Sequence, residues 1–183
     1  ALGAAFGVAY MAMMSERECY IILNPKEITA DIERVLAELK KYPDLERIVI
    51  SGDEAVALSD EESVLVMVDY HKPSMSISQK VYDVFDKIAV IDHHRRGDEF
   101  PDKPLLTYIE STASSASELV AELIQYRSTR KTQIPKFITT SLLAGIYVDT
   151  KNFSVRTTAR TFDIAGYLKN QGADTSLVQY MLS

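Results

Sequence analysis

The sequence has only one cysteine, Cys19, so no disulfide can form within the chain. This composition suits a reducing compartment. Cys19 lies in the apolar run CYIIL, and such a position favours a buried, inert thiol over a reactive one. Thiol chemistry is therefore not expected.

The sequence also lacks an excess of positive charge. It has 26 acidic and 20 basic residues, which give a net charge of −6. A general nucleic-acid-binding surface needs a broad positive potential, so no contact with long nucleic acid is expected. A small nucleotide held by a local basic cluster remains compatible with this charge.

The sequence has no hydrophobic run long enough to span a bilayer, which takes about 20 residues. The opening ALGAAFGVAYMAMM is apolar, but it is too short and lacks the basic start of a signal peptide. It predicts a buried core helix, and no membrane contact by this domain is expected. With 183 residues, 46% apolar and 25% charged, the chain fits one globular domain over residues 1–183.

Short apolar runs alternate with amphipathic segments in the first half of the chain. Strands are predicted at Cys19–Leu23, Ile48–Ile50, Ser63–Val68 and Ile88–Ile91. Helices are predicted at Leu2–Met14, 28–39, Ser78–Phe85, Ser115–Tyr126, Ile134–Val148, Thr158–Asn170 and Thr175–Leu182. This order predicts an α/β fold in which a mostly parallel sheet is flanked by helices and is followed by a helical C-terminal half.

All three histidines directly follow predicted strands. His71 lies in VDYHKP, and His93 and His94 lie in IDHHRR. The ends of parallel strands meet at one edge of a sheet, where ligands bind in such folds. Carboxylates and imidazoles bind Mn²⁺-type ions, and lysine and arginine neutralise phosphate, so this edge predicts a metal and phosphate site. The competing interpretation is a pair of solvated polar loops.

Two later segments add candidate residues. Asp149 ends an apolar helix, where an anion is unfavourable unless a cation lies near it. Ser115 and Glu118 have the spacing of a capping box, which also leaves a helix N-terminus able to bind an anion.

The tripeptide Asp92-His93-His94 after a buried strand resembles the signature of the DHH phosphoesterase superfamily. VDYHKP, SSASEL and AGIYVDTKNF accompany it in order, and together these motifs span most of the chain. Their wording is most similar to the cyclic-di-AMP phosphodiesterases of the GdpP/YybT type, which segments 156–162 and 172–174 also resemble. The resemblance implies a two-metal, usually Mn²⁺-dependent hydrolase that opens cyclic di-AMP to the linear dinucleotide pApA.

The resemblance also implies roles for individual residues. The expected metal ligands are Asp69, which bridges two ions, His93 and Asp149. The expected catalytic residues are His94 and Arg95, and the expected substrate-binding residues are His71, Lys72, Ser114 and Arg95. Asp92 and Glu118 are expected to orient these residues without binding metal.

The family's first motif, His-x-x-x-Asp-x-Asp, lies on a strand before a helix that begins Ala-Leu-Gly, and this chain starts at Ala1-Leu2-Gly3. We therefore expect a catalytic-domain fragment that lacks this strand and the smaller DHH-associated domain that follows in the family. Two Mn²⁺ ions are expected in the intact enzyme, with at most one well-formed site here. The resemblance implies a cytoplasmic domain of a membrane-anchored bacterial protein.

Two alternatives stay open. One is another phosphoesterase of the superfamily: an oligoribonuclease, a pyrophosphatase, or a single-strand exonuclease, which the acidic charge disfavours. The other is a catalytically inactive nucleotide-binding module. The metal and the oligomeric state, a monomer or a homodimer, are also left open.

Overall fold

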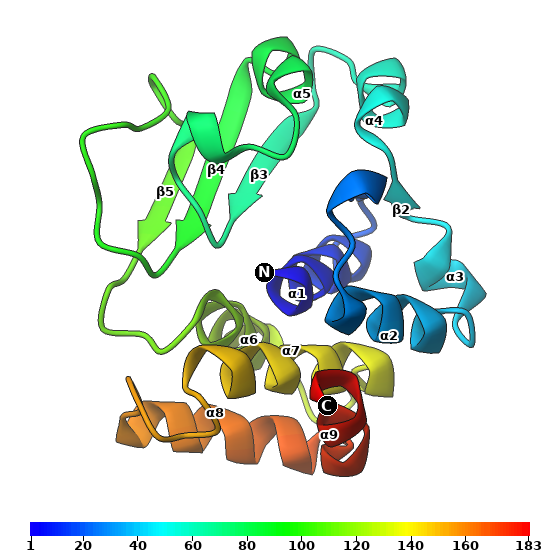
Figure 1. The fold of residues 1–183 in the computed structure, drawn as a ribbon, viewed down its shortest axis with the longest axis vertical. Helices are drawn as coiled ribbons and strands as arrows, with labels where there is room; N and C mark the ends of the chain where they lie inside the picture. The colour runs from blue at the N-terminus through cyan, green and yellow to red at the C-terminus, as the bar shows by residue number, and fades with distance from the viewer.

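A computed structural model describes residues 1–183 and shows strands and helices alternating in the first half of the chain, with only helices after the last strand (Figure 1). The strands are β1 (Ile21–Ile22), β2 (Val49–Ile50), β3 (Val64–Val68), β4 (Lys87–Asp92) and β5 (Leu106–Ile109). The helices are α1 (Leu2–Met14), α2 (Ala30–Leu39), α3 (Pro43–Glu46), α4 (Gly52–Leu58), α5 (Gln79–Val84), α6 (Ala116–Arg127), α7 (Lys136–Asp149), α8 (Ala159–Asn170) and α9 (Thr175–Leu182). The predicted fold class is confirmed.

The strands form two separate parallel sheets. β1 pairs with β2, and β3, β4 and β5 form a three-stranded sheet in that order. Val68 is opposite Ile91, and Asp92 is opposite Ile109, so the three strands end at one edge. The arrows in Figure 1 show that this edge faces α6.

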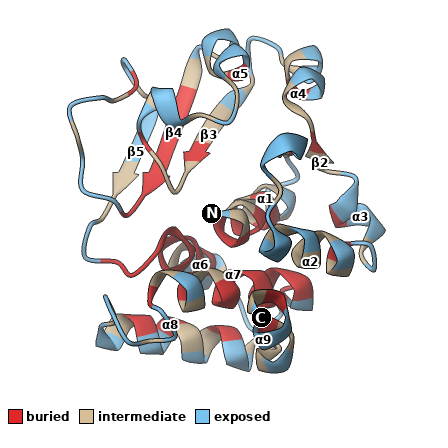
Figure 2. Cartoon of the chain, viewed as in Figure 1, coloured by how far each residue is buried: buried red, intermediate tan, exposed pale blue.

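Helix α1 is buried in the centre of the molecule, against α6 and α7, as its apolar sequence predicts (Figure 2). Phe6 meets Phe137 of α7 edge to face, with ring centroids 4.9 Å apart. Gly3 allows the two helices to approach closely, because a Cβ atom there would lie 2.2 Å from the carbonyl oxygen of Ser141. No helix of the structure has the length and hydrophobicity that crossing a membrane requires.

Several features differ from the sequence prediction, and the short helix α3 is one that was not predicted. The expected single sheet is divided, because β1 and β3 do not pair. Helix α4 was not predicted, although Ser51 and Glu54 form a complete capping box at its start. Strand β5 was not predicted either; its residues are exposed or half-buried, and it is defined by pairing with β4.

Candidate metal centre

Three predicted metal ligands meet where the sheet edge faces the helices. Asp69 follows β3, His93 follows β4, and Asp149 is the last residue of α7. Nε2 of His93 lies 3.1 Å from Oδ1 of Asp69 and 3.3 Å from Oδ2 of Asp149. The His93 side chain is only 3% exposed, so this meeting point is largely shielded from water.

The backbone at Asp69 has an unusual conformation. Asp69 has φ 71°, a left-handed conformation that is uncommon outside glycine and often marks functional sites. Its N–H still donates to the carbonyl of Ile91, at 2.9 Å, so the β3–β4 ladder holds the strained residue. The backbone nitrogen of Ala1 lies 3.2 Å from Oδ2 of Asp69, so α1 begins beside this residue.

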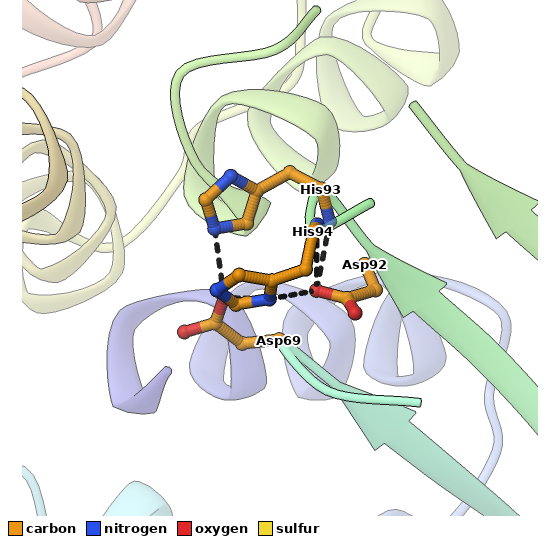
Figure 3. Close-up of side chains that lie close together, drawn as sticks. All are labelled: Asp69, Asp92, His93 and His94. Carbon is orange, nitrogen blue, oxygen red and sulfur yellow. Dashed lines mark hydrogen bonds and ion pairs between the residues drawn. The ribbon is translucent and has the colours of Figure 1, made fainter. Parts of the chain in front are cut away.

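Asp92 holds the surrounding loop through both of its oxygens, and Figure 3 shows the contacts of one of them with His93 and His94. Oδ1 accepts hydrogen bonds from the backbone N–H of His93, at 2.8 Å, and from Nδ1 of His94, at 2.7 Å. Oδ2 lies 2.7 Å from Nδ1 of His71. Because a carboxylate only accepts, both imidazoles carry their proton on Nδ1. Asp92 is fully buried, and this geometry supports the orienting role predicted for it.

His71 and Lys72 are placed differently from the ligands. The second ring nitrogen of His71, Nε2, accepts from the backbone N–H of Gly97 at 3.0 Å, so neither ring nitrogen is free for a phosphate. Lys72 is exposed, and its side chain lies beside Gly97. Substrate contact by these two residues stays a prediction.

The carboxylates dominate the electrostatics of the centre. Burial alone would lower the pKa of His93, but Asp149 and Asp69 raise it to about 9. Burial would raise the pKa of Asp69, yet His93 lowers it. The pKa of Asp92 is likewise lowered, against the effect of burial, by His71 and His94. Without metal, His93 is therefore an imidazolium between carboxylates at neutral pH.

The residues present fit a divalent metal ion. Asp69, Asp92, His93 and His94 offer ligand atoms within 4.8 Å of one another. Oδ1 of Asp69 and Nε2 of His93 are buried, and their 3.1 Å contact lacks the geometry of a hydrogen bond. A cation that replaced the His93 proton would satisfy both atoms, and it would also neutralise the anion that Asp149 places at a helix C-terminus.

A polar cavity of about 470 Å³ adjoins this centre. It is lined by His93, His94, Arg95, Ser111, Thr112, Ala113, Arg156, Thr157 and Thr158. The structure thus brings the predicted His94 and Arg95 to one cavity. It adds residues from the loops before α6 and α8 that had no predicted role. The sequence held one signal for these residues, the pair Thr157-Thr158. Threonine is a common helix cap, and Thr158 caps α8.

The serine-rich segment is mostly buried. The Ser114 side chain is not exposed, and its hydroxyl lies 3.3 Å from that of Ser115, so its contact with substrate stays a prediction. Ser115 caps α6 by accepting from the N–H of Glu118 at 3.0 Å. The reciprocal capping-box bond is absent, because the buried Glu118 carboxylate instead accepts from the hydroxyl of Thr161 and lies near Arg160.

Comparisons with known proteins identify the family of the chain. Residues 1–146 match the DHH family, N-terminal domain. The chain is 45% identical over 181 residues to "Cyclic-di-AMP phosphodiesterase GdpP" of Bacillus subtilis, covering 99% of this chain and 27% of that protein. It is 43% identical over 181 residues, with the same coverage, to "Cyclic-di-AMP phosphodiesterase PdeA" of Listeria monocytogenes. The chain thus spans about a quarter of the length of these relatives.

Two more distant similarities, one in sequence and one in structure, were also found. A probable manganese-dependent inorganic pyrophosphatase of Streptococcus thermophilus is 28% identical, over 82% of this chain and 44% of that protein. The crystal structure of an exopolyphosphatase-related protein from Bacteroides fragilis aligns with a TM-score of 0.72 at 20% identity, covering 98% of this chain and 51% of that one. From these matches, and above all the one over residues 1–146, the chain belongs to the DHH family.

Proposed function

We propose that this chain is the catalytic domain of a metal-dependent phosphodiesterase that opens cyclic di-AMP to pApA. The observation that carries the proposal is the position of His93. Its Nε2 lies 3.1 Å from Oδ1 of Asp69 and 3.3 Å from Oδ2 of Asp149. The names of the B. subtilis and L. monocytogenes relatives support the substrate.

We further propose that the metal is Mn²⁺, held by Asp69, His93 and Asp149. Mixed carboxylate and imidazole ligands suit this ion, and the S. thermophilus relatives are named manganese-dependent. When bound, the metal supplies activation of a water molecule and neutralisation of phosphate charge.

The residues of the chain then bind and orient the substrate. Asp92 fixes the Nδ1 proton of His94, which leaves Nε2 as the free nitrogen of a half-exposed ring at the cavity. His94 and Arg95 lie where a phosphate would be held beside the metal centre. They stabilise the negative charge that grows as water attacks phosphorus and the 3′-oxygen leaves.

We propose that the whole protein adds a strand between the two sheets and a DHH-associated domain after this one. A mostly apolar groove of about 480 Å³ lies between β1 and β3, with lining residues that include Val8, Ile21 and Val66. Ala1 lies in this lining and beside Asp69, which follows β3. A strand that ran through the groove into α1 would therefore be parallel to β3 and would end at the metal centre. Its residues would provide the second Mn²⁺ site.

The number of Mn²⁺ ions bound per chain tests this part of the proposal. We expect the 1–183 chain to bind at most one Mn²⁺ and the full-length protein two. Two tight sites on the 1–183 chain would contradict it. That the domain is cytoplasmic and belongs to a membrane-anchored protein also stays a prediction.

The activity is tested by giving the full-length protein cyclic di-AMP, pApA and pyrophosphate side by side, with Mn²⁺ or with a chelator. We expect conversion of cyclic di-AMP to pApA that the chelator abolishes. Pyrophosphate turnover without cyclic di-AMP turnover would instead favour a pyrophosphatase, which the S. thermophilus similarity keeps as the second candidate. Binding of cyclic di-AMP without turnover would indicate a nucleotide-binding module.

A further inference from the structure

The polar cavity beside the metal centre has an unusual charge for this protein. Its lining includes two arginines, two histidines and several hydroxyls, and no carboxylate. The chain as a whole carries a net charge of −6. A cavity lined in this way selects an anion, and Arg95 and Arg156 supply forked N–H groups that match phosphate oxygens.

Arg156 is presented by a loop whose backbone is strongly constrained. Left-handed φ values cluster at Lys151, Asn152, Phe153 and Arg156. Thr150 holds this loop, because its hydroxyl oxygen accepts from the N–H of Phe153 at 2.9 Å and its carbonyl accepts from the N–H of Val155 at 2.9 Å. Strain of this kind persists only where surrounding contacts over-determine it, so these contacts fix the backbone of the loop that carries Arg156.

Aromatic packing fixes the same loop from the side of α8. The ring of Phe153 stacks on Phe162, with centroids 5.3 Å apart, and meets Tyr147 of α7 edge to face at 5.0 Å. The loop that bears Arg156 is therefore clamped between α7 and α8.

A network of ion pairs links the two segments that line the cavity, the start of α8 and the loop before α6. Arg160 of α8 pairs with Glu122 of α6, its Nε lying 2.5 Å from Oε2 of that residue. It also lies 3.3 Å from Glu110, which directly precedes the cavity residue Ser111. The start of α8 and the loop before α6 are thus both tied to one guanidinium.

We propose that Arg156 binds the phosphate that is not cleaved, and so selects a substrate with two phosphates over one with a single phosphodiester. The metal centre takes the phosphate that reacts. His94 and Arg95 hold that phosphate from the cavity, and Arg156, in the wall of the same cavity, takes the other. This inference rests on the proposed function, and it makes Arg156 a specificity-determining residue for a dinucleotide.

The test compares two substrates of the full-length protein in Mn²⁺. Cyclic di-AMP has two phosphates, and bis(p-nitrophenyl) phosphate has one. For Arg156→Ala we expect the ratio of kcat/KM for cyclic di-AMP to kcat/KM for the small diester to fall about tenfold or more, mainly through KM, because a charge-assisted contact is lost. Arg156→Lys keeps the charge and should recover part of the ratio.

Arg130→Ala is the matched control. Arg130 is exposed in the loop between α6 and α7 and lines no part of the cavity, so its loss should leave the ratio unchanged. If Arg156→Ala moves the ratio no more than Arg130→Ala, while the wild type still opens cyclic di-AMP, this inference is overturned and the proposed function stands. If the wild type does not open cyclic di-AMP, the proposed function fails and the inference falls with it.

Discussion

Nε2 of His93 lies 3.3 Å from Oδ2 of Asp149, so the end of β4 and the end of α7 meet at one pair of side chains. These residues are 56 positions apart in the sequence (149 − 93). The contact joins the sheet to the helical half, and in our account it is the core of a metal site.

Removing either partner should weaken Mn²⁺ binding. For His93→Ala and Asp149→Asn we expect an affinity loss at least as large as the roughly 10–100-fold caused by losing a supporting residue. Activity on cyclic di-AMP should fall as well. Isothermal titration with Mn²⁺ measures the affinity. Asp163→Asn, an equivalent change at an exposed position of α8, is the control. Wild-type Mn²⁺ affinity and turnover in His93→Ala would show that His93 is not a ligand.

Arg160→Met should destabilise the fold. It removes the guanidinium from Glu110, Glu118 and Glu122, and Glu118 is fully buried. A buried carboxylate left without its cation costs about 3 kcal/mol, the low end of the usual range, because Arg160 is 29% exposed. Urea denaturation measures the loss. Adding Glu118→Gln to Arg160→Met should restore part of the lost stability. If Arg160→Met alone stayed within about 0.5 kcal/mol of wild type, the ion pairs of Arg160 would not stabilise the fold.

Two glycine-to-alanine changes should have opposite effects. At Gly3 the new Cβ would meet the backbone carbonyl of Ser141 at 2.2 Å, so α1 must shift from α7, and we expect a loss of about 1–3 kcal/mol. At Gly166, in α8, no atom lies within 4 Å, so alanine should stabilise by about 0.5–1 kcal/mol. Thermal unfolding of both variants measures this. Equal changes in Tm would argue against the close α1–α7 contact.

Asp174 should make stability depend on pH in the acid range. Its Oδ1 accepts from the N–H of Leu177, at 3.1 Å, and Oδ2 lies 3.3 Å from Nζ of Lys136; these contacts lower its pKa, the backbone bond more strongly. A lowered pKa gives stability that is present above the ordinary carboxyl value of about 4 and lost as pH falls through the folded-state value.

The variant Asp174→Asn isolates this effect, because asparagine still caps the helix but does not titrate. The stability advantage of wild type over Asp174→Asn should therefore shrink between about pH 7 and about pH 3. Chemical denaturation of both proteins across this range measures the difference. A constant difference would show that the Asp174 charge contributes nothing.

Much of the fold could be predicted because long apolar patterns are local. The predicted bounds of α1 match the structure, and those of α7, α8 and α9 agree to within about two residues. Asp69 and His93 could be placed together from the parallel-strand rule alone, since β3 and β4 are neighbours. Helix α4 was not predicted, although Ser51 and Glu54 form a complete capping box at its start.

The parts that could not be predicted depend on contacts between distant segments. β5 has no clear apolar alternation and is a strand because β4 offers it an edge. Likewise, Arg156 follows β4 by more than 60 residues and reaches the cavity only through the loop between α7 and α8. Residue spacing within a motif cannot predict that Arg156 reaches this cavity, because its position depends on how the helices pack.

The most direct measurement is anomalous X-ray diffraction from crystals of the protein grown with Mn²⁺. If Asp69, His93 and Asp149 bind the metal, the wild type should show a manganese peak at these residues and His93→Ala should show none there. A wild-type crystal with manganese only at other residues, or with none under conditions that support turnover, would show that these residues do not form the metal site.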